Sequence, residues 1–167
     1  MQEVFLDQPR LITSVRYHDE RGFFSELFRD SSLSARFVQD NCSFSKKGVI
    51  RGLHFQPGQS KYVTVLKGAI FDVALDIRPD SPAFGTWQSF ELSFENGNSL
   101  FVPDGFAHGF CVLTEEATVM YKVSAYYDPL LQGGIHFLDP MLQIPWPVDQ
   151  PIVSRRDQAL PCLGKTA

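Results

Sequence analysis

The feature of the sequence that most limits its fold is a series of short strand-like segments separated by turns. Apolar, β-branched and aromatic residues gather in these segments, and the sustained 3.6-residue apolar spacing of a long helix is missing. The segments are residues 49–55, 62–67, 70–77, 87–94, 100–102, 109–113 and 118–127. Turn residues such as Pro57-Gly58 and Asn96-Gly97 stand between them. Short strands at this spacing predict one antiparallel sandwich or barrel.

The composition fits a β-rich fold with short connections. Aromatic residues form 13% of the 167 residues, and 12 Gly and 11 Pro are available for turns. At about 150 residues per domain, the length predicts a single domain over residues 1–167. Short helices are predicted only at the periphery, over residues 32–37 and after Ser154, where Asp157 completes a capping pattern.

Charge and cysteine content argue against several classes of protein. Stretches without Asp, Glu, Lys or Arg run to only ten residues, for example 105–114, whereas a membrane helix needs about 20 apolar residues. The net charge is −4, and no stripe of Lys or Arg indicates a nucleic-acid surface. Three widely spaced cysteines and an N-terminus without a secretory signal predict a reducing, cytoplasmic location.

The segment around His54 is the first candidate site for chemistry. Arg51 and His54 would lie on opposite faces of a regular strand, but Gly52 between them is typical of a β-bulge. A bulge would bring both side chains onto one face. Because arginine binds phosphate bidentately and histidine titrates near neutral pH, the pair suits an anionic substrate approached by a general base. The alternative is a histidine with a structural role only.

A second motif surrounds His108, just before the predicted strand 109–113. Residues 98–108 resemble the second motif of the cupin superfamily, a strand followed by proline, glycine and histidine at set spacing. A metal-binding cupin also needs two histidines one residue apart and a downstream glutamate, and His54 has no such partner. Since a transition metal requires three or four converging ligands, we predict a cupin-like antiparallel jelly-roll barrel with no metal and no cofactor.

Four further residues have structural interpretations. Asp72 lies on a strand face that is either exposed to solvent or part of a polar cavity. Tyr121 is flanked by valines on its own face, as a core residue with a satisfied hydroxyl would be, although acid–base chemistry is its alternative. Lys61 is most simply a solvated lysine, and Asp157 a capping residue.

Six motifs occur in the order seen in dTDP-4-dehydrorhamnose 3,5-epimerases, which the chain resembles from about Asp19 to Asp157. They are DERGFF (19–24), VQDN (38–41), RGLHFQ (51–56), FDVALDIR (71–78), PDGFAHGF (103–110) and YK (121–122). The resemblance implies a cupin-like homodimer that acts on a nucleotide-linked 4-keto-6-deoxy sugar, most simply a dTDP sugar. Neither a metal nor a cofactor takes part in the implied reaction.

The resemblance also implies a role for individual residues. His54 would remove the proton next to the ketone, and Asp157 would orient it. Tyr121 would return a proton from the opposite face, which inversion of a carbon requires, and Lys61 would stabilise the enolate oxygen. The implied substrate-binding residues are Arg21, Glu26, Gln39, Asn41, Arg51, Asp72, His108, Tyr127, Gln132 and Arg156. Among these, Tyr127 would stack on the nucleobase, and Arg21 lies in a segment that crosses to the partner subunit.

Three departures from the family pattern leave alternatives open. The loop between His54 and Lys61 is shorter than in typical members, and Gln132 and Arg156 stand where many members have Glu and Lys. The leading hypothesis is an epimerase that inverts carbons 3 and 5 of dTDP-4-dehydro-6-deoxy-D-glucose to give dTDP-4-dehydro-L-rhamnose. The alternatives are an epimerase acting at one carbon or on another nucleotide sugar, a metal-dependent cupin oxygenase or isomerase, and a non-catalytic sugar-nucleotide binding module.

Overall fold

The fold is built almost entirely of antiparallel strands, as the sequence predicts. The structure is a computed structural model of the chain and describes residues 7–30, 33 and 35–164. Its elements are β1 (Arg10–Thr13), β2 (Arg16–Asp19), β3 (Gly22–Ser25), β4 (Gln39–Lys46), β5 (Ile50–Phe55), β6 (Lys61–Lys67), β7 (Ala69–Asp76), β8 (Trp87–Ser93), β9 (Asn98–Val102), β10 (Phe106–Val112), β11 (Glu116–Val123), β12 (Gly133–Gly134) and α1 (Arg155–Gln158).

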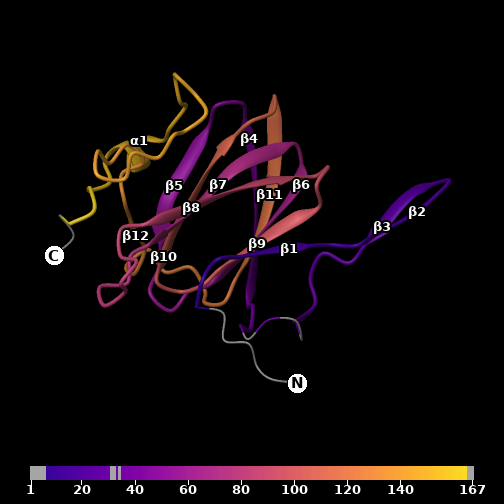
Figure 1. Cartoon of the computed structure of the whole chain (residues 1–167), viewed down its shortest axis with the longest axis horizontal. Helices are drawn as coiled ribbons and strands as arrows, with labels where there is room; N and C mark the ends of the chain where they lie inside the picture. The colour runs from indigo at the N-terminus through magenta and orange to yellow at the C-terminus, as the bar shows by residue number, and fades with distance from the viewer. Residues whose placement is uncertain (1–6, 31–32, 34, 165–167) are drawn as a thin grey trace.

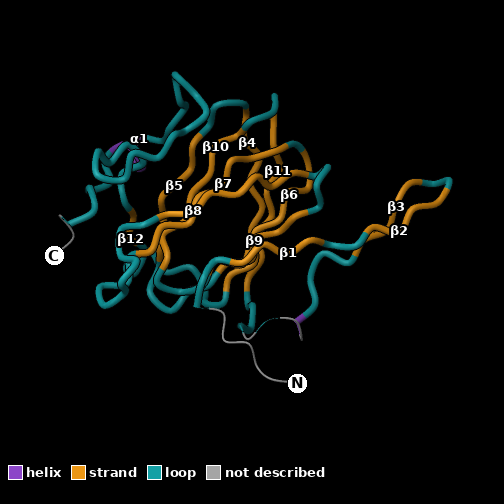
Figure 2. Tube along the Cα trace, viewed as in Figure 1, coloured by secondary structure: helices purple, strands orange, loops and turns teal. Residues whose placement is uncertain are grey.

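Strand order identifies the barrel as a jelly roll. One five-stranded sheet has the order β1-β9-β6-β11-β4, and the other has the order β12-β5-β10-β7-β8. Within the series β4 to β11, the first strand pairs with the last, and successive strands alternate between the sheets except at the β7–β8 hairpin, which is the pattern of a jelly roll. Figures 1 and 2 show the two sheets facing each other around a common interior. The predicted cupin-like jelly roll is confirmed.

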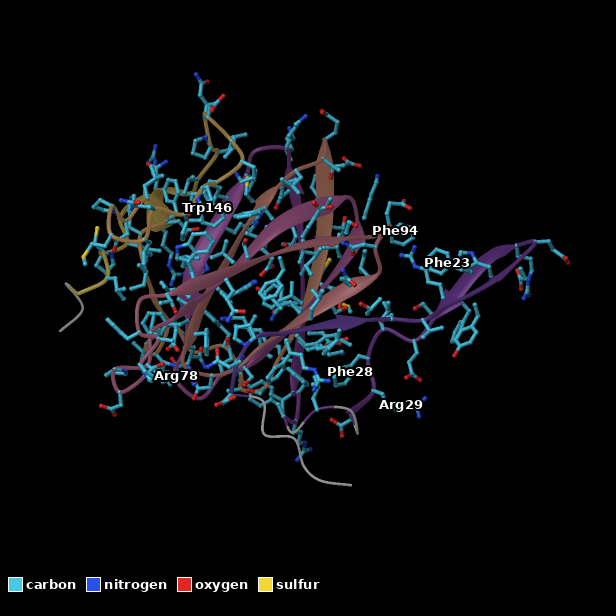
Figure 3. All side chains as sticks on the ribbon, in the orientation of Figure 1. Phe23, Phe28, Arg29, Arg78, Phe94 and Trp146 are labelled. Carbon is cyan, nitrogen blue, oxygen red and sulfur yellow. The ribbon has the colours of Figure 1, made fainter. Side chains whose placement is uncertain are left out.

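Two apolar layers hold the barrel together. The layer between the sheets contains alternate side chains of the facing strands, such as Val63, Leu100 and Phe110. The second layer lies on the outer face of the sheet that contains β5 and β10, where Leu53 and Ile144 pack beneath the C-terminal segment. Figure 3 places Trp146 of this segment against the same sheet. Because that sheet is covered on both faces, alternate side chains of β7 enter either the outer layer or the barrel interior.

The predicted irregularity in β5 is confirmed. In the pairing with β10, His54 lies opposite His108 and Arg51 opposite Phe110, so two residues of β5 face the single residue Gly109. Gly52 has a φ of +124°, and a Cβ at this position would lie 2.5 Å from the Cα of Gly109. Only glycine fits this close approach of two backbones. The extra residue brings Arg51 and His54 to the interior.

A two-stranded hairpin projects from the barrel. Strands β2 and β3 pair with each other and belong to neither large sheet, and Figure 1 shows them extending away from the body of the molecule. At the base, the Arg16 guanidinium lies 4.2 Å from the Phe23 ring centroid, and Phe23 is 5.6 Å from Phe94. Tyr17 and Phe24, which pair with each other across the hairpin, are 63% and 70% exposed.

One of the two predicted helices forms. Helix α1 begins after Ser154, whose side chain accepts a hydrogen bond from the amide of Asp157. For the other, residues 32 and 34 lie outside the described part of the chain, and residues 33 and 35–37 are not helical. Phe37 instead packs edge-on against Phe28, with 5.3 Å between ring centroids. This tertiary contact outweighs the weak local preference for a helical turn.

Candidate active site

A cavity of about 710 Å³ opens within the barrel and is lined largely by polar side chains. The lining residues come from β4, β5, β6, β10 and β11, from Val49 and Gln59 just before β5 and β6, and from the segments 127–132 and 152–157. Most of the residues predicted to act on a substrate line this cavity: His54, Lys61, Tyr121, Asp157, Gln39, Asn41, Arg51, His108, Tyr127, Gln132 and Arg156. The fold therefore brings together groups that are up to 118 positions apart in the chain (from Gln39 to Asp157).

His54 and Asp157 form a hydrogen-bonded pair at the cavity wall. His54 Nε2 lies 2.7 Å from Asp157 Oδ1, and the Gly52 amide donates to the other carboxylate oxygen at 3.2 Å. Burial raises the pKa of Asp157, but the hydrogen bonds from His54 and Gly52 outweigh it, so this pKa lies below its ordinary value. A carboxylate that accepts from Nε2–H leaves the lone pair of a neutral imidazole on Nδ1. The pair is thus suited to general base catalysis.

Lys61 provides a positive charge beside this base. Its side chain is only 7% exposed, and Nζ donates to the backbone carbonyl of His54 at 3.1 Å. Burial lowers the pKa of Lys61 to about 8, and the nearby carboxylates of Asp72 and Asp104 oppose the effect. The solvated interpretation of Lys61 is therefore wrong, because the ammonium lies in the cavity wall rather than in bulk water.

Asp72 lies behind the cavity wall rather than on the solvent side of β7. It is fully buried, and both of its carboxylate oxygens lie 2.9 Å from His108 Nε2. Burial raises the pKa of Asp72, while His108 and Lys61 act in the opposite direction. His108 itself lies inside β10, which begins three residues earlier than the predicted strand 109–113. Of the two interpretations of this face of β7, the structure selects the polar interior.

Tyr121 lines the cavity from the sheet opposite the one that carries His54. It lies on β11 opposite Asn41 of β4. Burial raises the pKa of its hydroxyl, and the charge of Arg51 opposes that effect. The Arg51 guanidinium is held by a hydrogen bond from Nε to Ser45 Oγ at 2.9 Å. Tyr121 therefore presents a protonated phenol at neutral pH to the same space as the His54 imidazole.

The cavity rim is held by amide side chains. Gln39 Oε1 accepts from the amide of Tyr127 at 3.2 Å, and Arg156 Nη2 donates to Gln132 Oε1 at 2.5 Å. The sequence did not indicate Gln56, which donates to the Tyr126 carbonyl and accepts from the Asp128 amide, both at 2.9 Å. Gln56 thus fixes the loop that carries Tyr127.

Two further lining residues were also missed. Gln59 lines the cavity and donates to the Ala125 carbonyl at 2.9 Å. Ser43 lines it from β4, and its hydroxyl has no hydrogen-bond partner among the described residues. Polar residues stand at every second position from 39 to 45, and this alternation could have indicated Ser43. The same pattern is typical of a strand with one face in solvent, so it points to a cavity only when the barrel interior is known to be polar.

Three predicted substrate-binding residues do not line the cavity of their own chain: Asp72, which lies behind its wall, and Arg21 and Glu26. Arg21 is 85% exposed at the tip of the β2–β3 hairpin, where it forms an ion pair with Asp19 at 2.6 Å. Glu26 follows the hairpin and pairs with Arg29 at 2.6 Å. Within the described ranges, no three His, Cys, Asp or Glu side chains converge in the way a metal site requires. The described helix is also too short and too polar to cross a membrane.

The comparison with known proteins agrees with this geometry. A family model described as dTDP-4-dehydrorhamnose 3,5-epimerase matches residues 3–165, which is nearly the whole chain. The chain belongs to this epimerase family. The predicted family and the predicted enzyme class, an isomerase, are therefore confirmed.

Epimerases of this family from several organisms are similar in sequence and structure. The dTDP-4-dehydrorhamnose 3,5-epimerase of Shigella flexneri is 43% identical over 164 residues, covering 93% of this chain and 88% of the relative. The dTDP-6-deoxy-D-glucose-3,5-epimerase of Legionella pneumophila, solved with dTDP-4-keto-L-rhamnose, is 45% identical with a TM-score of 0.92, covering 99% and 93% of the two chains. A dTDP-4-dehydrorhamnose 3-epimerase from Streptomyces niveus is 40% identical over 156 residues, covering 88% and 75%.

Proposed function

We propose that the protein inverts carbons 3 and 5 of dTDP-4-dehydro-6-deoxy-D-glucose and so forms dTDP-4-dehydro-L-rhamnose. The observation that carries this proposal is the meeting of a His54–Asp157 pair, a buried lysine and the Tyr121 phenol around one cavity. Family membership supports the choice of substrate, and so does the dTDP-sugar complex of the Legionella pneumophila epimerase. No cofactor is needed for proton transfer next to a ketone.

In the proposed mechanism, His54 Nδ1 removes the proton from a carbon next to the ketone. The electrons of the broken C–H bond move onto the carbonyl oxygen, and the Lys61 ammonium stabilises the resulting enolate. Asp157 stabilises the imidazolium that forms. Tyr121 then gives its hydroxyl proton to the carbon from the opposite face, and exchange with solvent restores both groups. A single base returning its own proton would regenerate the substrate, so inversion requires the second group.

We assign the remaining lining residues to substrate binding. Arg51 and Arg156 supply positive charge for the diphosphate, since guanidinium groups bind phosphate oxygens bidentately. Tyr127 offers an aromatic face to the thymine ring. Because Arg156 is hydrogen-bonded to the neutral Gln132 rather than to a carboxylate, its charge remains available at the rim. The nucleotide-sugar substrate and the odd number of cysteines support a cytoplasmic location.

Hydrogen exchange in deuterium oxide tests the proposed function. With dTDP-4-dehydro-6-deoxy-D-glucose, NMR should show deuterium entering at both carbon 3 and carbon 5. Exchange at carbon 3 alone would instead favour a single-carbon epimerase, like the Streptomyces niveus relative by its name. If neither proton exchanged, the epimerase assignment would be wrong, and a binding module would be the better interpretation.

Tyr121→Phe should separate exchange from inversion. The variant keeps His54, which can remove a proton and return it to the same face, so deuterium should still enter. The inverted product should form about 10²–10⁴-fold more slowly, because the opposite-face donor is missing. The measurement compares deuterium uptake with product configuration in one NMR time course. Unchanged inversion in Tyr121→Phe would remove Tyr121 from the proposed mechanism.

We also propose that the active form is a homodimer in which the hairpin of one subunit reaches the cavity of the other. An isolated two-stranded hairpin is marginally stable in water, and this one exposes Tyr17 and Phe24. Docking on a second copy would cover these side chains. It would also explain how Arg21 and Glu26, which lie outside their own cavity, contact substrate.

Mixing two impaired variants should test this arrangement. Arg21→Ala should lower kcat/KM about 10–100-fold, the loss expected for a charge-assisted hydrogen bond, and His54→Gln should be nearly inactive. In a mixed dimer, one of the two cavities receives intact Arg21 and intact His54, so a re-equilibrated equal mixture should recover roughly a quarter of the wild-type activity. Sedimentation should give twice the 18.9 kDa chain mass. A monomer, or a mixture no more active than Arg21→Ala alone, would contradict the shared site.

A further inference from the structure

Behind the wall of the cavity lies a buried carboxylate, Asp72, to which the proposed mechanism gives no part. Asp72 is fully buried and does not line the cavity, so it cannot touch a substrate directly. It nevertheless lies one side chain away, because both of its oxygens contact His108, which does line the cavity. A fully buried carboxylate is costly unless it is paired. A buried carboxylate directly behind the cavity-lining His108 therefore calls for a functional explanation.

A series of contacts across β5, β10 and β7 connects Lys61 of β6 with Asp72. The Lys61 ammonium donates to the carbonyl of His54, and His54 lies directly opposite His108 across the β5–β10 pair. His108 in turn joins β10 to β7 through its hydrogen bonds with Asp72. Lys61 and Asp72, both buried, are thus linked through His54 and His108.

Two carboxylates, those of Asp72 and Asp104, influence the protonation of Lys61. Asp72 on β7 and Asp104 in the turn between β9 and β10 both favour its protonated form, with Asp72 having the larger effect. Asp104 is exposed, and its carboxylate accepts hydrogen bonds from Gly58 and Gly105. Water therefore screens the charge of Asp104 more strongly than that of Asp72.

The remaining titratable groups around this region have partners elsewhere. His54 on β5 is bonded to Asp157, His108 on β10 is bonded to Asp72, and Tyr121 faces them from β11. The negative charge of Asp157 is directed to His54 and to the Gly52 amide. Asp72 is thus the buried carboxylate that can balance a charged Lys61.

We propose that Asp72 is a positioning residue that keeps Lys61 in its charged form beside the substrate ketone, while it also fixes the orientation of the His108 ring. This inference rests on the proposed function, because it assumes that the Lys61 ammonium faces an enolate. A neutral amine at this position would leave the enolate without its counter-charge. Asp72 therefore sets the upper end of the pH range in which the enzyme works, without contacting substrate.

The test compares Asp72→Asn with the wild-type protein. Asparagine has nearly the same shape, and its amide oxygen can still accept from His108, so the barrel should fold. The ¹³Cε chemical shift of Lys61, identified by its absence in Lys61→Arg, reports the titration without substrate. We expect its midpoint to fall by about one pH unit or more in Asp72→Asn, the effect of losing a nearby opposite charge. Activity at pH 8 should then fall about fivefold relative to wild type.

Two controls separate this role from a structural one. The ratio of variant to wild-type activity should rise toward one as the pH is lowered, whereas a packing defect would reduce activity at every pH. Asp104→Asn should shift the Lys61 midpoint less than Asp72→Asn does. An unmoved midpoint in Asp72→Asn, or an equal shift in Asp104→Asn, would overturn the proposal.

The same experiments distinguish a failure of the proposed function from a failure of the role proposed for Asp72. If wild-type protein exchanges neither the carbon 3 nor the carbon 5 proton, the proposed function fails, and the proposal for Asp72 as an enzyme residue fails with it. The Lys61 titration would still show whether the two charges are coupled. If wild type exchanges both protons but Asp72→Asn leaves the midpoint and the pH profile unchanged, only the role of Asp72 is wrong.

Discussion

Replacing His54 by Gln is expected to slow hydrogen exchange at carbons 3 and 5 of the substrate about 10²–10⁴-fold. The reason is that the His54 imidazole is held by Asp157 with one ring nitrogen left for the substrate proton. Glutamine keeps a polar side chain in the cavity but has no basic nitrogen. Affinity for the dTDP sugar, measured by calorimetry, should change little because the diphosphate and nucleobase contacts remain.

His108→Gln provides a matched control for this prediction. His108 lines the same cavity and is also bonded to a buried carboxylate through Nε2. If His54 is the base, His108→Gln should retain more exchange activity than His54→Gln. Asp157→Asn should fall between wild type and His54→Gln, since the base remains but its imidazolium loses a counter-charge. Full exchange in His54→Gln would contradict the mechanism and favour a non-catalytic binding module.

Lys61→Met should have two opposite effects, a large loss of activity and a gain in stability. Removing one preorganised stabilising group at a developing oxyanion costs about 10²–10³ in kcat. Stability should rise because the pKa of Lys61 falls from 10.5 to about 8 on burial, which means that the folded state carries the cost of a buried charge. That shift corresponds to about 3 kcal/mol in the free energy of unfolding below pH 8, as an upper limit.

The stability gained in Lys61→Met should depend on pH. Between pH 8 and 10.5, the unfolded chain binds the Lys61 proton more tightly than the folded one, so the Lys61 contribution to wild-type stability becomes more favourable as pH rises. Lys61→Met lacks this contribution, and its advantage should shrink across that window. Urea denaturation at pH 7 and at pH 10 measures both values.

Lys67→Met is the control for the stability measurement. Lys67 lies on the same strand, but its side chain is 65% exposed and paired with Glu116. Exposed ion pairs contribute about 0–1 kcal/mol, so this variant should be close to wild type at both pH values. A Lys61→Met protein that is less stable than wild type at pH 7 would show that the ammonium is well compensated in the folded state.

The barrel and most of the cavity could be predicted from the sequence because their signals are local. Seven apolar, strand-like segments are separated by turn residues, and this pattern predicts the barrel. Gly52 indicated the irregularity that brings Arg51 and His54 together. The strand β4 was not predicted, although its first three residues belong to the recognised motif 38–41. Its inward side chains Gln39, Asn41 and Ser43 are polar, so the usual sign of a buried face is absent.

The remaining features depend on contacts between distant segments. Gln56 reaches residues 70 and 72 positions away to hold the loop that carries Tyr127, and no local pattern indicates such a contact. Among the described residues after the hairpin, Phe28 and Phe37 contact Tyr62 edge-on, a tertiary contact that no local pattern indicates. The burial of Lys61 likewise results from the closed barrel, since a lysine at the start of a strand is ordinarily solvated.

The hydrogen bond between His54 and Asp157 joins positions 103 residues apart, which determines when during synthesis the protein can become active. The ribosome makes β4 to β11, and so the complete jelly roll, before it reaches Asp157 in α1. A nascent chain that has reached Val123 therefore has the strands of the cavity and a histidine without its carboxylate. Because a domain generally folds as a unit, and because Tyr127 and Arg156 of the proposed binding site also follow Val123, we expect neither binding nor catalysis before the C-terminal segment has been made. Catalytic competence then arrives with the docking of one four-residue helix.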